Sequence, residues 1–276
     1  MEQTRTPQET EGTTSRPQRS PQSAPKIRIM QGFWAIVIRD LKRLWAQPIR
    51  LVSGVAQPLL YLFLLGSGLG ATTQFGGAGY LQYIFPGVVT LSLLFTATFA
   101  AITIVFDREI GFLKAVLVAP IPRRAVALGK VFSGALQAFA QGVILLLTAP
   151  IIGVTFGFFE LIGFLFFMLL GGLVFSSLGV AVATRFSSTE VFPVVINAVL
   201  LPMFFLSGAL YPLDTAPGWI QTLAYVDPVA YAVDLLRGMT LGEFYFPVAL
   251  SVTVLVAVIA VLVAESIRVF EKGEEA

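Results

Sequence analysis

The sequence predicts an all-α membrane protein with six transmembrane helices. Hydrophobic residues make up 56% of its 276 residues and charged residues 12%, and its mean hydropathy is +0.84. Soluble globular chains carry about a quarter charged residues, so the composition excludes that class. Six segments are long and apolar enough to cross a hydrocarbon core of about 30 Å as helices.

The predicted spans fill a transmembrane domain at 48–270. The first span is short, and the fifth holds Pro193 and Pro202, which transmembrane helices tolerate where neighbouring groups bond the freed carbonyls. The predicted spans are Leu51–Leu69, Ile84–Val105, Val131–Ile152, Leu161–Ala183, Val191–Leu210 and Phe246–Ile267.

Both ends of the chain are predicted to be cytoplasmic. Residues 1–25 are rich in Pro, Gln, Thr and Ser and predict a disordered tail, and 271–276 form a second, short tail. No apolar run precedes Ile36, so no cleaved signal is predicted. Six crossings put every lysine and arginine except Arg237 on one side, and the positive-inside rule assigns that side to the cytoplasm.

Residues 26–47 predict an amphipathic connecting helix in the inner interface. Within Ile27–Gln47, apolar side chains recur near helical spacing, and Arg39, Asp40 and Arg43 are expected on the opposite face. Two interpretations remain open. The helix either anchors the chain to anionic lipid or also contacts a cytoplasmic partner.

The loop Asp107–Lys130 predicts a second short helix, which begins at the membrane exit and is ended by Pro120 and Pro122. Its apolar side chains fit the groove of another protein, and an interfacial helix without a partner is the alternative. Arg123, Arg124 and Lys130 are expected to face the cytosol.

The stretch Leu210–Thr240 is too polar to span a bilayer and too apolar for an aqueous loop. Its prolines divide it into two short helices, Trp219–Ala224 and Val229–Gly238. The positive-inside argument places it on the outer face. It is expected to act either as a lid over a translocation path or as a rigid cap that braces the fifth and sixth helices.

The sequence contains no cysteine and no histidine, which excludes disulfides, thiol nucleophiles and imidazole metal ligands. It also lacks a Gly-x-x-x-x-Gly-Lys-Ser/Thr loop for phosphates. No pair of carboxylates or other catalytic set lies at membrane depth. We therefore expect no enzyme activity, metal, bound cofactor or nucleic acid in this chain.

Two motifs resemble those of ABC-2 type transporter permeases. The first runs from Asp-Arg-Glu-x-Gly-x-Leu at 107–113 through Leu117-x-x-Pro120 to Leu-Gly-Lys at 128–130. The second runs from Asn197 to Arg237 and includes Phe-Leu-Ser-Gly at 205–208, Tyr-Pro-Leu at 211–213, Pro217-x-Trp219 and Asp227-Pro228. It is similar to the fifth helix and outer re-entrant hairpin of that family. The resemblance covers about 33–268, and the drug-resistance and lipid-oligosaccharide export branch is the most similar.

The resemblance implies an exporter permease that pairs with a second permease and with two copies of a separate ABC ATPase subunit, which holds ATP and Mg. The loop at 107–124 would be the coupling helix and 26–47 the connecting helix. Phe112 and Lys114 depart from the family's usual Thr and Glu, so the partner's groove is expected to differ. The implied coupling residues are Asp107, Arg108, Glu109, Gly111, Leu113, Leu117, Pro120, Arg123 and Arg124. The implied outer gate and hairpin residues are Leu210, Pro217, Trp219, Asp227, Pro228, Tyr231 and Arg237.

Polar groups inside the predicted spans are candidates for function or for helix–helix hydrogen bonds. Gln137 and Gln141, four residues apart, are expected on one face. We predict that Phe95 and Phe99 share a face with Thr98 and Ile102, with Thr96 nearer the other side, unless these rings face lipid. An aromatic lining would suit an amphipathic or apolar substrate. The candidate substrate path is Phe95, Thr96, Phe99, Asn197, Leu201 and Phe205.

The charges at 107–109 have two interpretations, a solvated helix end or a relay. In the relay, Glu109 pairs with Arg39, Arg43 or Arg108 and transmits motion from the loop. A membrane assembly or immunity factor with the same fold is the alternative to an exporter permease.

Overall fold

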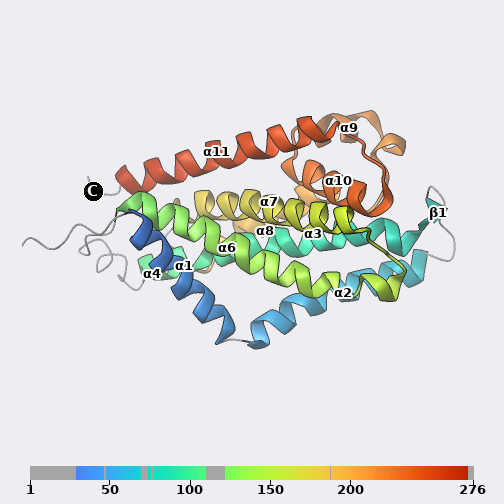
Figure 1. Ribbon diagram of the computed structural model, residues 1–276. Helices are drawn as coiled ribbons and strands as arrows, with labels where there is room; N and C mark the ends of the chain where they lie inside the picture. The colour runs from blue at the N-terminus through green and yellow to red at the C-terminus, as the bar shows by residue number, and fades with distance from the viewer. Residues whose placement is uncertain are drawn as a thin grey trace, which may run out of the picture.

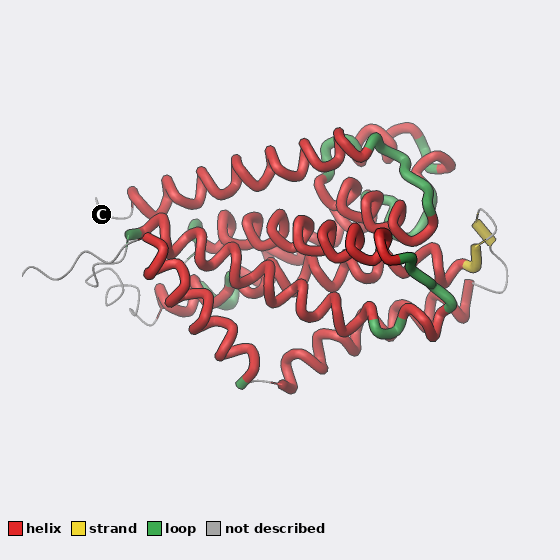
Figure 2. Tube along the Cα trace, viewed as in Figure 1, coloured by secondary structure: helices red, strands yellow, loops and turns green. Residues whose placement is uncertain are grey.

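The computed structural model describes residues 29–46, 48–69, 74–75, 78–109, 122–186 and 188–272. Three predicted segments lie wholly or mostly outside these ranges: the tail at 1–25, residues 273–276 of the tail predicted at 271–276, and residues 110–121 of the coupling helix. The first two residues of the C-terminal tail, 271 and 272, instead belong to the last helix. The chain folds into a helical bundle with short connections (Figure 1, Figure 2). The all-α prediction is confirmed, apart from two paired two-residue strands, β1 (Gln74–Phe75) and β2 (Ala78–Gly79).

The helices follow the predicted order. The α-helices are α1 (Ile29–Trp45), α2 (Pro48–Leu69), α3 (Tyr80–Ala100), α4 (Ile102–Glu109), α6 (Arg123–Leu146), α7 (Phe158–Ala183), α8 (Val191–Leu206), α9 (Gly218–Ala224), α10 (Pro228–Leu241) and α11 (Val248–Lys272). Two short 3₁₀ helices, η1 (Ala149–Ile152) and η2 (Leu213–Thr215), complete the described elements.

Four stretches of the described chain combine the length and the hydropathy that a membrane crossing needs. They are Tyr80–Asp107, Arg123–Leu146, Phe158–Ala183 and Val248–Glu271. Two shorter apolar helices, Gly54–Gly68 and Val191–Leu206, correspond to the predicted first and fifth spans. A count of six crossings therefore remains a prediction.

Several boundaries differ from the prediction for local reasons. The second span consists of α3 and α4, separated at Ala101, where the Thr103 hydroxyl donates to the Ala100 carbonyl (3.0 Å) and competes with the helical ladder. The third helix begins eight residues early, directly after Pro122, and ends at Leu146, before Pro150. The fifth ends at Leu206 because Gly208 takes a left-handed conformation, with φ of +74°.

Helices α3, α6 and α7 pack closely against one another and form the centre of the bundle. Small residues permit this approach. A Cβ added to Gly179 of α7 would lie 2.6 Å from the carbonyl oxygen of Thr98 on α3. Close backbone contact of this kind is typical of helix packing in membranes, where burying apolar surface from water provides no driving force.

The bundle has two distinct ends. Figure 1 shows α4, the start of α6 and the end of α11 together at one end, and α9 and α10 at the other. The two predicted hairpin helices are present, and each begins one residue earlier than predicted, α9 at Gly218 and α10 at Pro228. Helix α9 ends at Ala224 as predicted, whereas α10 continues three residues further, to Leu241.

Candidate functional site

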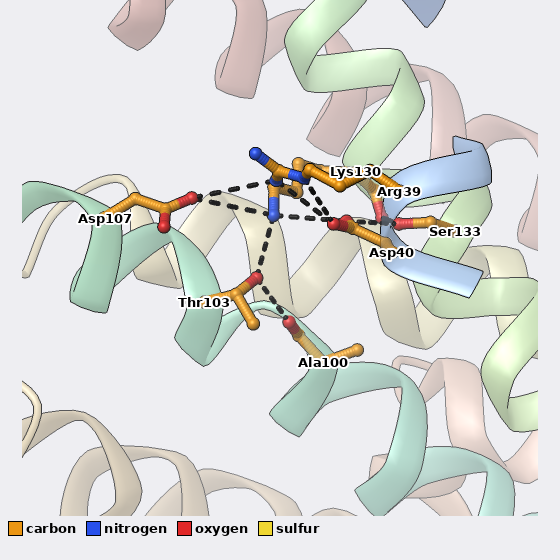
Figure 3. A network of polar contacts seen from close by, with 7 residues as sticks. All are labelled: Arg39, Asp40, Ala100, Thr103, Asp107, Lys130 and Ser133. Atoms are coloured by element: carbon orange, nitrogen blue, oxygen red, sulfur yellow. Dashed lines mark hydrogen bonds and ion pairs between the residues drawn. The ribbon is translucent and has the colours of Figure 1, made fainter. Parts of the chain in front are cut away.

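A buried ammonium group lies where α1, α4 and α6 meet. Lys130 of α6 is only 5% exposed, and its Nζ lies 3.1 Å from Oδ2 of Asp40 on α1. The same Nζ donates to the Thr103 hydroxyl (2.9 Å) and lies 3.8 Å from Oδ2 of Asp107 on α4. Figure 3 shows these side chains converging from three helices. We call them, with Arg39 and Ser133, the inner charge network.

The inner charge network is electrically balanced, with two cations and two carboxylates. Arg39 places its guanidinium 3.0 Å from Asp40 and 3.8 Å from Asp107. The Ser133 hydroxyl donates to the second oxygen of Asp40 (3.1 Å). A buried charge is tolerated only when it is paired and hydrogen-bonded, and both conditions hold here.

Two predictions about these residues were wrong. Lys130 does not face the cytosol, and Asp40 does not lie on the polar face of α1, because the two bond each other in the α1–α6 contact. Asp40 is buried together with Ile36, Val37 and Leu44 on the side of α1 that faces the bundle. Pairing with Lys130 offsets the cost of removing the carboxylate from water.

The contacts of the segment 107–109 bear on the predicted relay. Glu109 accepts a hydrogen bond from Thr189 (2.6 Å), in the connection between α7 and α8. Arg39 instead pairs with Asp107, two residues earlier. Arg43 lines a small void beside Asp40, Thr103 and Gln137. Among the described contacts, Arg39 therefore pairs with Asp107 and not with Glu109, while the predicted pairing with Arg108 lies outside the described side chains. The relay itself stays a prediction.

Arg123 and Arg124, predicted to couple to an ATPase, contact α11. Arg123 donates to the carbonyls of Phe270 (2.7 Å) and Glu271 (3.2 Å), and Arg124 pairs with the Glu271 carboxylate at 2.9 Å. Cations are favoured at the C-terminal end of a helix, where carbonyls lack partners. These arginines thus fasten the start of α6 to the end of α11.

Other predicted coupling residues cannot be placed. Gly111, Leu113, Leu117 and Pro120 lie outside the described residues, and of Arg108 only the backbone, in α4, is described. Among the described residues, no cluster of three or more carboxylate side chains could hold a metal ion.

At the other end of the bundle, Arg237 fastens the hairpin. This α10 residue is 8% exposed and donates to the carbonyls of Gly208 (2.9 Å) and Ala209 (3.3 Å), directly after α8. Its guanidinium carbon lies 4.1 Å from the ring centroid of Tyr83 on α3. One side chain therefore joins α10 to α8 and α3.

The other residues predicted for the hairpin are of two kinds, buried and exposed. Tyr231 donates to the Tyr225 carbonyl (2.8 Å), and Asp227, followed by Pro228, caps α10 by accepting from Val229 (2.8 Å). Trp219, by contrast, is 62% exposed, and Pro217 is also exposed. The buried residues hold the hairpin together, and the exposed ones form its outer surface.

The burial of Asp227 predicts that the stability of the folded chain depends on pH. Burial raises the pKa of Asp227 from 3.8 to about 7, against the opposing hydrogen bond from Val229. The folded chain then binds this proton more tightly than the unfolded chain, so stability falls as pH rises from about 4 to 7. Asp227→Asn, which keeps the cap, should give a shallower fall in unfolding midpoint between pH 5 and pH 8.

The control for that measurement is Asp214→Asn, since Asp214 is exposed. It should retain the pH slope of the unchanged protein. Burial also raises the pKa of Asp234, although hydrogen bonds from Tyr245 and Phe246 and the charge of Arg237 oppose this rise. A residual slope with the same sign is therefore expected in Asp227→Asn, and an unchanged slope would contradict the assignment.

Two adjoining chambers lie among α2, α3, α6 and α8. The larger, of about 350 Å³, is lined by Phe95, Thr96, Phe99 and Gln141, among others. The smaller, of about 190 Å³, is apolar, and Leu201, Phe205 and Leu210 line it. Gln57, Leu91 and Phe95 line both, so the chambers share a wall.

Most residues of the predicted substrate path line one of the two chambers. Thr96 lines the larger chamber with Phe95 and Phe99, whereas Thr98 is buried and donates to the Phe175 carbonyl (3.2 Å). The prediction that Thr98 shares the aromatic face was therefore wrong. Asn197 lines neither chamber.

These features are those of a helical membrane protein with two chambers among its apolar helices. The sequence profile of the ABC-2 type transporter family matches residues 31–241. The chain belongs to this family.

Three relatives illustrate the similarity. A putative transport permease ycf38 of Cyanophora paradoxa is 29% identical over 78% of this chain and 76% of the relative. Nodulation protein J of Rhizobium leguminosarum bv. trifolii is 33% identical over 70% and 74%. A probable doxorubicin resistance ABC transporter permease protein, DrrC, of Mycobacterium tuberculosis is 25% identical over 82% and 83%.

Proposed function

We propose that this chain is the transmembrane permease subunit of an ATP-binding cassette exporter. It moves an amphipathic or apolar substrate across the cytoplasmic membrane by alternating access, driven by a separate ATPase subunit. The observation that carries the proposal is the inner charge network, because Asp107 joins the end of α4 to α1 and α6. The family match supports the same assignment.

In this proposal the working complex contains two permease chains and two ATPase subunits. ATP and Mg bind the ATPase subunits, and this chain performs no bond chemistry. Six helices cross the membrane, α2 and α8 being the short ones, with both termini in the cytoplasm. The α9–α10 hairpin is re-entrant from the outer face, where Leu210 lies beside the apolar chamber.

The coupling mechanism follows from the position of α4. Helix α4 ends at Glu109, inside the segment 107–124 that is proposed to contact the ATPase. Displacement of that segment shifts Asp107, and its contacts with Arg39 and Lys130 transmit the shift to α1 and α6. Interfaces of this kind change by rigid-body steps because packed helices deform little.

Asp107→Asn should uncouple ATP hydrolysis from transport. The variant keeps the size of the side chain but removes its charge, so Arg39 and Lys130 lose one of their two carboxylates. We expect at least a fivefold loss of substrate-stimulated ATPase activity in liposomes that contain both subunits, with assembly unchanged on size exclusion. A loss of this size corresponds to about 1 kcal/mol of coupling energy.

Glu109→Gln provides the matched control, since it removes the same charge from the same helix, and among the described side chains Glu109 bonds Thr189 and not the inner charge network. It should retain most of the stimulation. Equal loss in both variants would mean that net charge at the end of α4, and not the network, controls coupling.

The substrate is proposed to be a drug, a lipid or a lipid-linked glycan. The name of one relative, a probable doxorubicin resistance permease, supports a drug as cargo, and the aromatic rings in the larger chamber support an amphipathic or apolar one. Stimulation of ATP hydrolysis by a panel of drugs, lipids and glycans tests this assignment. No stimulation by any class would contradict it.

A further inference from the structure

The larger chamber carries an unusual set of polar groups. Three glutamines, Gln57, Gln137 and Gln141, line it together with the hydroxyls of Ser92 and Thr96. Carboxamides and hydroxyls both donate and accept hydrogen bonds. Among the described residues that line the two chambers, none carries a charge.

Two of these groups are buried without a hydrogen-bond partner among the described residues. Gln141 is 3% exposed, and its Nε2 forms no hydrogen bond to the described residues. The same is true of the Ser92 hydroxyl. A buried donor left unpaired costs free energy. Because Gln141 lines the chamber, its amide is stabilised when it turns toward a hydrogen-bond acceptor inside the chamber.

The backbone makes room for this amide. Gly54 of α2 lies against the side chain of Gln141, and an added Cβ would overlap the carboxamide. Gln137 lies one turn earlier on α6 and lines the same wall. The two amides therefore border one compartment, which we call the amide chamber.

The neighbouring chamber has the opposite character. Its lining is apolar or aromatic except for Gln57 and the Tyr61 hydroxyl, and includes Phe95, Phe204 and Phe205. It reaches Leu210, beside the outer hairpin, whereas the amide chamber reaches Leu44 at the end of α1. The polarity thus changes along the bundle from amide-rich to apolar.

We propose that the amide chamber binds the uncharged polar head of an amphipathic substrate, such as a glycosyl group, with the attached alkyl chain in the apolar chamber. Neutral hydroxyl-rich heads match amides that donate and accept. A cationic or anionic head would lose its hydration without gaining a counter-charge. This inference rests on the proposed function, whose cargo it narrows to neutral amphiphiles.

Photolabelling of the full-length chain in lipid nanodiscs tests the proposal without an ATPase. The probe is dodecyl maltoside with a diazirine on its alkyl chain. We expect saturable labelling of α3 and α8. Unlabelled dodecyl maltoside should compete at least about tenfold better than dodecyltrimethylammonium or dodecyl sulfate, the factor expected for a lost hydrogen bond or an unpaired buried charge.

Gln141→Leu separates binding from a structural role. Replacing a buried unpaired amide by an apolar side chain of similar size should leave the unfolding midpoint unchanged or raise it, while labelling falls about tenfold. Gln141→Glu should reverse the preference in favour of dodecyltrimethylammonium, since a carboxylate then lines the chamber.

The matched control is Gln221→Leu on α9. Gln221 donates to the carbonyls of Asp214 (3.3 Å) and Ala216 (2.9 Å), away from both chambers. Its loss should lower the unfolding midpoint and leave labelling intact. The proposal is overturned by unsaturable labelling, by equal competition from the charged detergents, or by a Gln141→Leu variant that loses stability together with labelling. If the unchanged chain is labelled as expected but shows no ATP-driven transport when it is combined with its ATPase, the result would instead contradict the exporter function.

Discussion

Replacing Lys130 by methionine should destabilise the folded chain by about 3–5 kcal/mol, the cost of leaving a buried carboxylate without its partner. Asp40 is 7% exposed, so water does not replace the lost ammonium group. Arg39 still contacts Asp40, but from the solvent side, where its own side chain is 45% exposed. Equilibrium unfolding of the purified chain in mild detergent measures the effect.

Two further variants show whether the loss of stability in Lys130→Met arises from the Lys130–Asp40 pair. Asp40→Asn combined with Lys130→Met removes both charges and should recover more than half of the lost stability, because neighbouring effects are not additive. Arg124 lies on the same helix as Lys130 and pairs with Glu271 of α11, and these two side chains are 64% and 44% exposed. Arg124→Met should therefore lower the free energy of unfolding by less than about 1 kcal/mol. Equal costs for Lys130→Met and Arg124→Met would contradict the burial argument.

Replacing Arg237 by leucine should release the outer hairpin from the bundle. The variant loses charge-assisted hydrogen bonds to Gly208 and Ala209 and the contact with Tyr83. Hydrogen bonds to charged groups contribute about 1.5–3 kcal/mol each, so we expect a total loss of about 3 kcal/mol. Hydrogen–deuterium exchange in α10 should accelerate about a hundredfold, as that free energy implies.

The control for Arg237→Leu is Arg185→Leu. Arg185 pairs with Glu265 at 2.8 Å, but both side chains are substantially exposed, so exchange in α10 should not change. Arg237→Lys keeps the charge above Tyr83 but loses the planar fork, and it should give an intermediate effect. Unchanged α10 exchange in Arg237→Leu would mean that apolar packing alone holds the hairpin.

The hairpin could be predicted because its boundaries are local. Pro217 and Pro228 fix φ and lack N–H donors, which favours helix starts at these positions, and α9 and α10 begin there. The spacing of Gln137 and Gln141 likewise placed both on one face, and both line the larger chamber.

The inner charge network could not be predicted because its contacts are distant in sequence. Ser133 and Asp40 are 93 residues apart, and α1 alone gives Asp40 no reason to be buried. A lysine between apolar residues is compatible with either a solvated helix end or a buried pair. Only the packing of α1 on α6 decides whether Lys130 is solvated or paired. In the same way, the hydrogen-bond partners of Arg237 depend on where the turn after α8 lies, which is also a contact distant in sequence.

The central claim, that this chain is the membrane subunit of an ABC exporter, is tested most directly by ATP hydrolysis in liposomes. The assay combines the chain with an ABC ATPase subunit and measures hydrolysis with and without the substrate panel. We predict stimulation that requires the chain and that falls in Asp107→Asn but not in Glu109→Gln. Hydrolysis that is the same with the chain, without it and with the Asp107→Asn variant would contradict the claim.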